Sequence, residues 1–151
     1  MLTSNGKALL KINSSYQRLT QGSVYKGTAG TNITLGGDSE LNYILNSLVL
    51  VFGEGTTEPT PDDYCLEDAI DTLSVVVSTN TANTDKPNYS QNYILICQAT
   101  VKNNTEEDIT ISEIGIQGTD TGKGDVLITR DTFKPITIAP QKTYTVSVTI
   151  G

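Results

Sequence analysis

Histidine and tryptophan are absent from the sequence, and only two cysteines occur among its 151 residues. Histidine is the commonest general acid or base and the commonest metal ligand, so its absence excludes Ser-His and Cys-His nucleophile pairs. The two cysteines, Cys65 and Cys97, have no zinc-binding or redox spacing. Each lies in an apolar stretch, which predicts buried free thiols; a disulfide would require an oxidising compartment. The sequence therefore predicts a protein that is not an enzyme and has no cofactor or metal.

Positive charge is also scarce, since 10 Lys and Arg face 17 Asp and Glu and give a net charge of −7. Nucleic-acid binding needs clustered cations, and here they are scattered. No apolar run reaches the roughly 20 residues of a membrane span. The first residues do not resemble a signal peptide, because Lys7 and Lys11 interrupt their short apolar stretch. We therefore expect neither nucleic acid nor membrane as a partner, and synthesis in a cytoplasm.

What the sequence does contain is a series of short apolar or alternating stretches separated by turn residues. These are SVYKG, NITLG, LVLVF, DTLSVVVSTNT, YILICQATV, ITISEIGI, VLITR and KTYTVSVTI, the last with the strongest period of two. The length suits one domain over residues 1–151, within which residues 1–40 could form an N-terminal arm. The pattern predicts a mostly β fold: an antiparallel β-sandwich or jelly-roll-like domain with one or two short helices.

The stretch ITISEIGI changes phase half-way along. Ile109 and Ile111 alternate in one phase, whereas Ile114 and Ile116 alternate in the other. A slip of one residue moves side chains to the opposite face of a strand. The change near Ser112–Glu113 therefore predicts a β-bulge or a local twist.

Two segments outside the strands also carry predictions. Residues 4–12 favour a short helix with Ser4 as its N-cap, although Gly6 weakens that pattern. Residues 79–92 are almost wholly polar and are typical of a long exposed loop, with Tyr89 as its one candidate anchor.

The stretch VFGEGTTEPTPDDYCLED, residues 51–68, is rich in glycine, proline and acids. It predicts a corner where a strand leads into a helix, with Gly53 and Gly55 allowing a sharp turn. Thr60 can be the N-cap, Pro61 suits the first helical position, and Asp63 completes a capping-box pattern. The inward face of this helix would consist of Leu66, Ala69 and Ile70, with Cys65 beside them.

Chemical interpretations of the acidic and glycine-rich stretches are weaker. Asp63, Glu67 and Asp71 would share one helical stripe that could attract a cation, but a calcium loop places acids on alternate residues around a central glycine. No two carboxylates have the contrasting surroundings of a glycosidase pair. GTDTGKGD has three rather than four residues before its Gly-Lys, lacks the following Ser or Thr, and precedes a strand, so it predicts a hairpin loop rather than a phosphate loop.

Two parts of the sequence resemble structural proteins of tailed bacteriophages. In those proteins a strand ends in a Gly-x-Gly-Thr-Thr turn, and Pro-x-Pro-x-Asp leads into a short helix with Leu-Glu. The matching residues here are Gly53, Gly55, Thr56, Thr57, Pro59, Pro61, Asp63, Leu66 and Glu67. ITISEIGIQG and VLITRDTFKPITIAPQKTYTVSVTI are similar to their closing strands, through Glu113, Ile114, Gly115, Leu127, Arg130, Pro135, Thr137, Ile138 and Pro140. Gln141 departs from the pattern, because glycine commonly follows that proline.

The resemblance implies a non-enzymatic virion protein that acts in assembly, as a head-decoration, collar or tail component. Its partners would be other virion proteins and copies of itself, so we expect a homo-oligomer located in the virion. Residues 1–40 and 79–92 are the segments where we expect contacts. The alternative is a receptor- or carbohydrate-binding module of a fibre or adhesin. Such a module needs clustered aromatic residues, and among the seven tyrosines only Tyr89 and Tyr93 lie close in sequence.

Overall fold

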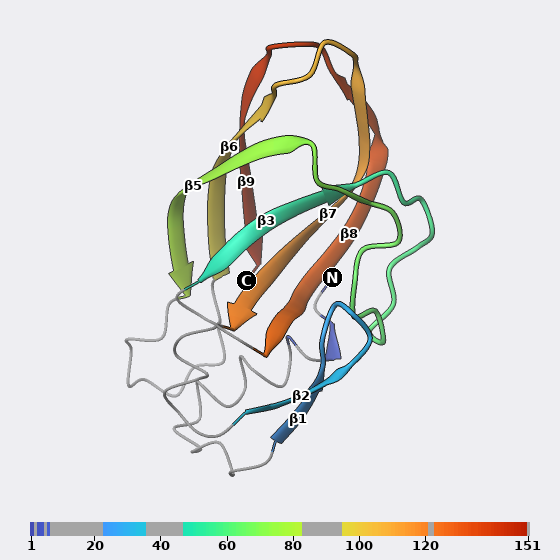
Figure 1. Ribbon diagram of the computed structural model, residues 1–151, viewed down its shortest axis with the longest axis vertical. Coiled ribbons are helices and arrows are strands. Elements are labelled where there is room, and N and C mark those ends of the chain that lie inside the picture. Colours follow the sequence, from blue (N-terminus) through green and yellow to red (C-terminus); the bar gives the residue numbers. More distant parts are fainter. Residues whose placement is uncertain are drawn as a thin grey trace.

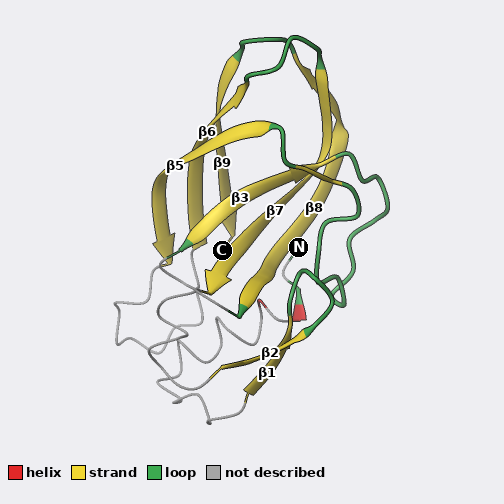
Figure 2. Cartoon of the chain, viewed as in Figure 1, coloured by secondary structure: helices red, strands yellow, loops and turns green. Residues whose placement is uncertain are grey.

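The computed structural model describes residues 1, 3, 4, 6, 23–35, 47–82, 95–120 and 123–150. These residues form a mostly β, antiparallel, sandwich-like fold, as the sequence predicts (Figures 1 and 2). The strands are β1 (Ser23–Lys26), β2 (Asn32–Leu35), β3 (Leu48–Gly53), β4 (Ala69–Ile70), β5 (Leu73–Ala82), β6 (Leu95–Asn103), β7 (Ile109–Asp120), β8 (Gly124–Ile138) and β9 (Thr143–Ile150). Ser4 and Gly6 have helical backbone, and the rest of the helix expected over 4–12 lies outside the described residues. No helix among the described residues has the length and apolarity that crossing a membrane requires.

Two sheets face one another across the core. One has the strand order β4-β3-β7-β8 and the other β5-β6-β9, while β1 and β2 form a separate hairpin. Leu48, Leu50 and Phe52 of β3 are buried against the second sheet, to which β6 contributes the fully buried Cys97 and Ala99. Both β3 and β6 therefore alternate between core-facing and half-buried residues.

The predicted bulge in β7 is present. The register between β7 and β8 shifts between Ile111 and Glu113, and again between Ile116 and Gln117. The first shift allows the isoleucines on either side of it to pack in or against the same core despite their opposite phases. It also sends the side chain of Glu113 to the opposite face of the sheet, where the candidate site lies.

Two predicted boundaries are wrong. β5 extends to Ala82, so the beginning of the loop expected over 79–92 is strand, and residues 83–92 lie outside the described part of the chain. β8 is much longer than VLITR and continues through Pro135. Proline lacks the N–H that an inner strand needs, but β8 is the edge strand of its sheet and can accommodate it.

Part of that edge is covered by the first residues of the chain. Met1 and Arg130 exchange two backbone hydrogen bonds, of 2.7 Å from the Met1 amine and 3.0 Å from the Arg130 N–H. The Thr3 N–H donates to the Ile128 carbonyl at 3.0 Å, and its hydroxyl donates to the Leu127 carbonyl at 2.7 Å. Met1 and Thr3 thus pair with β8 in the antiparallel sense.

Asn103 fixes the end of the sandwich at which β6 leads into β7 and β8 into β9. Its side chain is fully buried, and its amide donates to the carbonyls of Glu107 at 2.7 Å and Ile138 at 2.8 Å. Its side-chain oxygen accepts hydrogen bonds from the Thr105 N–H at 2.9 Å and hydroxyl at 2.7 Å. All four hydrogen-bonding positions of this amide are therefore occupied. The sequence predicts only turn residues between the strands that flank Asn103.

Gln141, where the resemblance expects glycine, has a φ of 60°. This left-handed conformation is strained for residues with a Cβ, above all for β-branched ones. We expect Gln141→Val to lower the free energy of unfolding by about 1–2 kcal/mol. Gln141→Gly should stay within about 0.5 kcal/mol of the parent, because the relieved strain offsets the greater freedom of the unfolded chain. Urea denaturation of the three proteins checks this, and equal stability of the two variants would contradict it.

Candidate functional site

The candidate site lies on the face of the four-stranded sheet opposite the core. Gly115 follows Ile114, which packs against the core, so its own position faces the other way. The loop of residues 54–68 covers this face and places the buried Leu66 beside Leu127 and Gly115. A Cβ on Gly115 would lie 2.9 Å from Leu127 Cδ1 and 3.1 Å from Leu66 Cδ2. The glycine therefore allows the loop to lie directly on the sheet.

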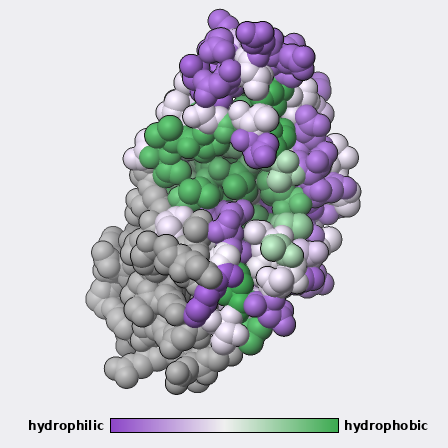
Figure 3. Space-filling model, in the orientation of Figure 1, coloured by the Kyte–Doolittle hydropathy of each residue, from purple (hydrophilic) through white to green (hydrophobic). Residues whose placement is uncertain are grey.

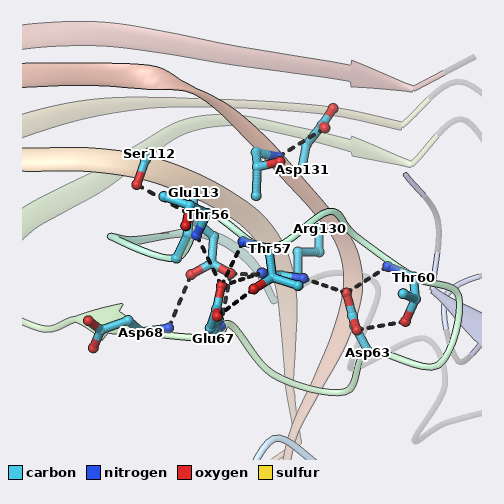
Figure 4. Close-up of polar contacts among 12 residues, drawn as sticks. Thr56, Thr57, Thr60, Asp63, Glu67, Asp68, Ser112, Glu113, Arg130 and Asp131 are labelled. Atoms are coloured by element: carbon cyan, nitrogen blue, oxygen red, sulfur yellow. Dashed lines mark hydrogen bonds and ion pairs between the residues drawn. The ribbon is translucent and has the colours of Figure 1, made fainter.

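Arg130 of β8 is the centre of the site (Figure 4). Its side chain is only 4% exposed, and each guanidinium nitrogen faces a carboxylate. Nε lies 2.5 Å from Glu113 Oε2, NH1 2.7 Å from Asp63 Oδ2, and NH2 3.4 Å from Glu67 Oε2. One arginine thus joins β7, β8 and two points on the covering loop.

Glu113 holds the loop from the sheet side. Its fully buried carboxylate accepts backbone hydrogen bonds from the N–H of Glu67 at 2.8 Å and of Asp68 at 3.3 Å, besides that from Arg130. Gly53 and Gly55 line the same carboxylate, and a Cβ on Gly53 would contact Glu113 Oε1 and lie 2.5 Å from the Asp68 carbonyl oxygen. These glycines are needed for close approach. Positive φ is found only at Gly30 and Gly124 among the described glycines, so it is close packing and not a left-handed conformation that favours glycine at Gly53 and Gly55.

Glu67 ties the two ends of the loop together. Its Oε2 accepts hydrogen bonds from the N–H groups of Thr56 at 3.0 Å and Thr57 at 2.9 Å, and Oε1 accepts one from the Thr57 hydroxyl at 2.6 Å. The same Oε2 faces Arg130. The Gly-Thr-Thr sequence therefore supplies donors for one carboxylate of its own loop.

The helix predicted to begin at Thr60 does not form. Only one half of the predicted capping box is present, because the Thr60 N–H donates to the Asp63 carboxylate at 2.9 Å. The Thr60 hydroxyl donates to the same carboxylate at 2.8 Å, and the Asp63 N–H donates to the Thr60 carbonyl at 3.2 Å. The chain then continues as a turn and loop to β4, which pairs with β3. A helix would need the Glu67 N–H to donate to the Asp63 carbonyl, but Glu113 takes that N–H. The expected acidic stripe is therefore absent: Asp63 and Glu67 point to Arg130, and Asp71 is exposed.

The electrostatic surroundings favour the charged forms of Asp63, Glu67 and Arg130. Burial opposes the charge of Asp63, but hydrogen bonds from Thr60 and Arg130 outweigh it and hold the pKa of Asp63 below its ordinary value. Hydrogen bonds from the Thr57 side chain and backbone do the same for the pKa of Glu67. Burial would lower the pKa of Arg130, but its hydrogen bonds to Asp63 and Glu113 raise it.

These shifts predict a loss of stability in acid. A carboxyl whose pKa is lower in the folded state stabilises the fold above its unfolded pKa, and this contribution disappears as the pH falls through the folded pKa. The free energy of unfolding should therefore fall below about pH 4, the ordinary range of these groups. Asp63→Asn should be less stable than the parent at pH 7 and show a shallower decline in acid. Urea titrations at several pH values test this prediction. If the free energy of unfolding fell equally steeply in acid for the two proteins, the prediction would be contradicted.

A shallow groove adjoins the network. One depression of about 240 Å³ is lined in part by Thr57, Cys65 and Arg130, and a second of about 310 Å³ by Ser4, Lys26 and Pro61. Tyr64 and the neighbouring aspartates line both, and the Lys26 ammonium lies 3.7 Å from the centre of the Tyr64 ring.

Cys65 is a free thiol but is half-buried, so its predicted burial is wrong, whereas Cys97 is free and buried as predicted. Burial, then the charges of Asp63 and Glu113, raise the pKa of Cys65, which makes it a poor nucleophile.

The glycine-rich stretch and the acidic residues were the other candidates for chemistry. GTDTGKGD joins β7 to β8 as a hairpin, and the strand predicted to follow it is confirmed. Across the described ranges, no group of three or more Cys, Asp or Glu side chains is arranged to hold a metal ion. The carboxylates that do gather share an arginine. Their arrangement can fix a loop on a sheet.

The sequence pattern predicts a cap at Asp63 and a shared stripe for Asp63 and Glu67, but it does not predict that these two residues meet Glu113 and Arg130. The phase change at Ser112–Glu113 was the one available signal of the site, because it turns Glu113 away from the core.

Comparisons of the chain with protein-family models, with curated proteins and with solved structures find no match.

Proposed function

We propose that the chain is a non-enzymatic structural protein of a tailed-bacteriophage particle, acting in assembly by packing against its own copies and its neighbours as a head-decoration, collar or tail component. The observation that carries this proposal is the convergence of the two resembling segments. Residues from the first segment (Gly53, Gly55, Thr57, Asp63, Glu67) and from the second (Glu113, Gly115, Arg130) form one contact network. A shared pattern that builds one structural unit is the kind of pattern that structural proteins have in common.

The network itself suits a structural role. The three guanidinium nitrogens of Arg130 face carboxylates of the same chain, and the loop amides reach Glu113 and Glu67. Buried ion pairs add little net stability compared with apolar packing, but they can favour one arrangement over others. A subunit that must present the same surface in every copy of a particle benefits from a loop held in one position.

Large apolar side chains are exposed on the surface and could pack against other subunits. Val24, Val76, Ile136 and Tyr144 are large apolar or aromatic residues that are each about half exposed, and Figure 3 shows apolar atoms gathered over β5 and β3. Exposed apolar patches commonly mark protein–protein contacts. The net charge of −7 would keep free subunits soluble before they assemble.

A receptor- or carbohydrate-binding module is the second candidate. It is favoured by the groove at Tyr64, where an aromatic ring and acidic side chains lie together. Binding of the purified chain to a glycan array or to host cells, lost in Tyr64→Ala, would support this function instead.

Immunogold electron microscopy tests the main proposal. Antibodies against the purified chain should label phage particles isolated from a lysate that expresses it, at regular positions and in many copies. Mass spectrometry of the same particles should detect the chain in fixed proportion to the other virion proteins. Its absence from purified particles, with the protein present in the soluble fraction, would overturn the proposal.

A further inference from the structure

The edges of the two sheets differ in how they are protected. Proteins block edge strands with charges, proline, bulges, short length or a covering segment, because an open edge pairs with other chains. β8 contains Lys134 and Pro135 and is covered in part by Met1 and Thr3, while β4 is only two residues long. β5 has a register shift between Val77 and Thr79.

Within the described part of the chain, β9 has none of these devices. Among the described residues it pairs only with β6, over an unbroken register of eight residues. Its sequence TYTVSVTI contains no charged residue, no proline and no glycine. Its side chains alternate strictly, and those of Thr143, Thr145, Ser147 and Thr149 are exposed.

The free side of β9 presents backbone groups in a regular order. The Asn103 N–H donates to the Lys142 carbonyl, which sets the phase of hydrogen bonding between β6 and the chain entering β9. In antiparallel pairing, alternate residues direct both N–H and C=O to the same neighbour. Tyr144, Val146 and Val148 therefore direct theirs to β6, and Thr145, Ser147 and Thr149 direct theirs away from it.

We propose that β9 pairs antiparallel with β9 of a second copy of this chain, so that two three-stranded sheets join into one. The alternation makes the strand complementary to itself. When the two-fold axis passes at Val146 or Ser147, each Thr or Ser lies opposite another Thr or Ser on the outer face. On the inner face, an axis at Val146 places Tyr144 opposite Val148, and an axis at Ser147 places Val146 opposite Val148. Cross-strand Thr pairs and apolar pairs both stabilise antiparallel sheets.

The inner face also gains burial. Tyr144, Val146 and Val148 lie opposite the buried Val101, Ala99 and Cys97 of β6, and so face the core side of the sheet. Tyr144 is nevertheless 46% exposed, and the two valines are only half-buried. A second β9 would cover the side of this row that β6 leaves open. The inference deepens the proposed function, since it names the surface through which copies of the subunit contact one another.

Light scattering and sedimentation across a range of concentrations test the pairing. The parent chain should have an even multiple of 16.2 kDa. Ser147→Lys should weaken self-association by about 100-fold or more, because like charges would be brought together near the two-fold axis. Ser147→Pro should act similarly, because it removes an outward N–H and leaves the bonds to β6 in place. Ser78→Lys, an exposed position on the opposite edge of the same sheet, is the matched control and should keep the parent mass.

Hydrogen exchange separates strand pairing from side-chain packing. In the associated state the amides of Thr145, Ser147 and Thr149 should exchange more slowly than in Ser147→Lys, with unchanged circular dichroism confirming that the variant is folded. A monomeric parent chain, or an oligomer that survives both substitutions, would overturn the inference. A monomer found in particles refutes the β9 pairing alone, whereas a β9-paired dimer absent from particles refutes the virion role alone.

Discussion

Replacing Arg130 with methionine is expected to lower the free energy of unfolding by about 3–5 kcal/mol, the usual cost of breaking a buried ion pair from one side. Methionine can fill much of the space of the arginine stem, so the loss reports the charge rather than a cavity. Glu113 would remain fully buried with its negative charge and only two backbone donors. Asp63 and Glu67 would lose their shared cation, and the loop of residues 54–68 its main attachment to β8.

Urea denaturation of a double-mutant cycle isolates the cause of this loss. Glu113→Gln removes the buried charge but keeps an oxygen that can accept from the Glu67 N–H. The double variant Arg130→Met/Glu113→Gln should therefore lose less stability than the sum of the two single losses, and this difference, the coupling energy, should be about 1–3 kcal/mol. A loss below about 1 kcal/mol in Arg130→Met, typical of an exposed pair, would show that the network contributes little.

Asn103→Asp is expected to cost about 3 kcal/mol or more at neutral pH, although it preserves the shape of the side chain. The amide of Asn103 donates to two backbone carbonyls, those of Glu107 and Ile138. A carboxylate there would face both carbonyls without a proton to donate, inside the protein. The turn after β6 and the end of β8 would then separate.

Asn104→Asp is the matched control, since it makes the same chemical change at an exposed neighbouring position and should alter stability by less than about 0.5 kcal/mol. The pH dependence gives a second test. Burial raises the pKa of a carboxyl, so the deficit of Asn103→Asp should grow as the pH rises above about 4. A deficit that stays constant from pH 4 to 8, or equal losses in both variants, would contradict the role assigned to Asn103.

Local patterns predicted the strands well, because alternation and apolar runs report directly which face of a strand is buried. The bulge near Glu113 was predictable for the same reason: a phase change can be seen within a few residues. The helix after Thr60 was not correctly predicted, although the Thr60 N–H does donate to the Asp63 carboxylate. Its amides are taken by Glu113, a residue 46 positions from Glu67 in the chain, and no local pattern reports such a competitor.

The candidate site could not be predicted from the sequence for a similar reason. Each of its residues has an ordinary local interpretation: Gly53 as a turn residue, Asp63 as a cap, Arg130 as a charge at a strand. Their common role appears only when the bulge, the pairing of β3 with β7 and the path of the covering loop are known together. The resemblance placed them in two groups, and the structure brings the two groups into contact.

The long β7–β8 hairpin has a consequence for the order in which the fold can form. Its strands are separated in sequence only by residues 121–123, so their pairing closes a short loop. The pairing of β3 with β7 closes a much longer loop, and loop-closure entropy costs about 0.6 kcal/mol for each doubling of length. Arg130 and Glu113 both belong to this hairpin, and their ion pair spans only 17 positions. The carboxylate of Glu113, which is fully buried in the folded protein, can thus pair with Arg130 early in folding. Asp63 and Glu67 belong to a distant part of the chain and can join the two residues later.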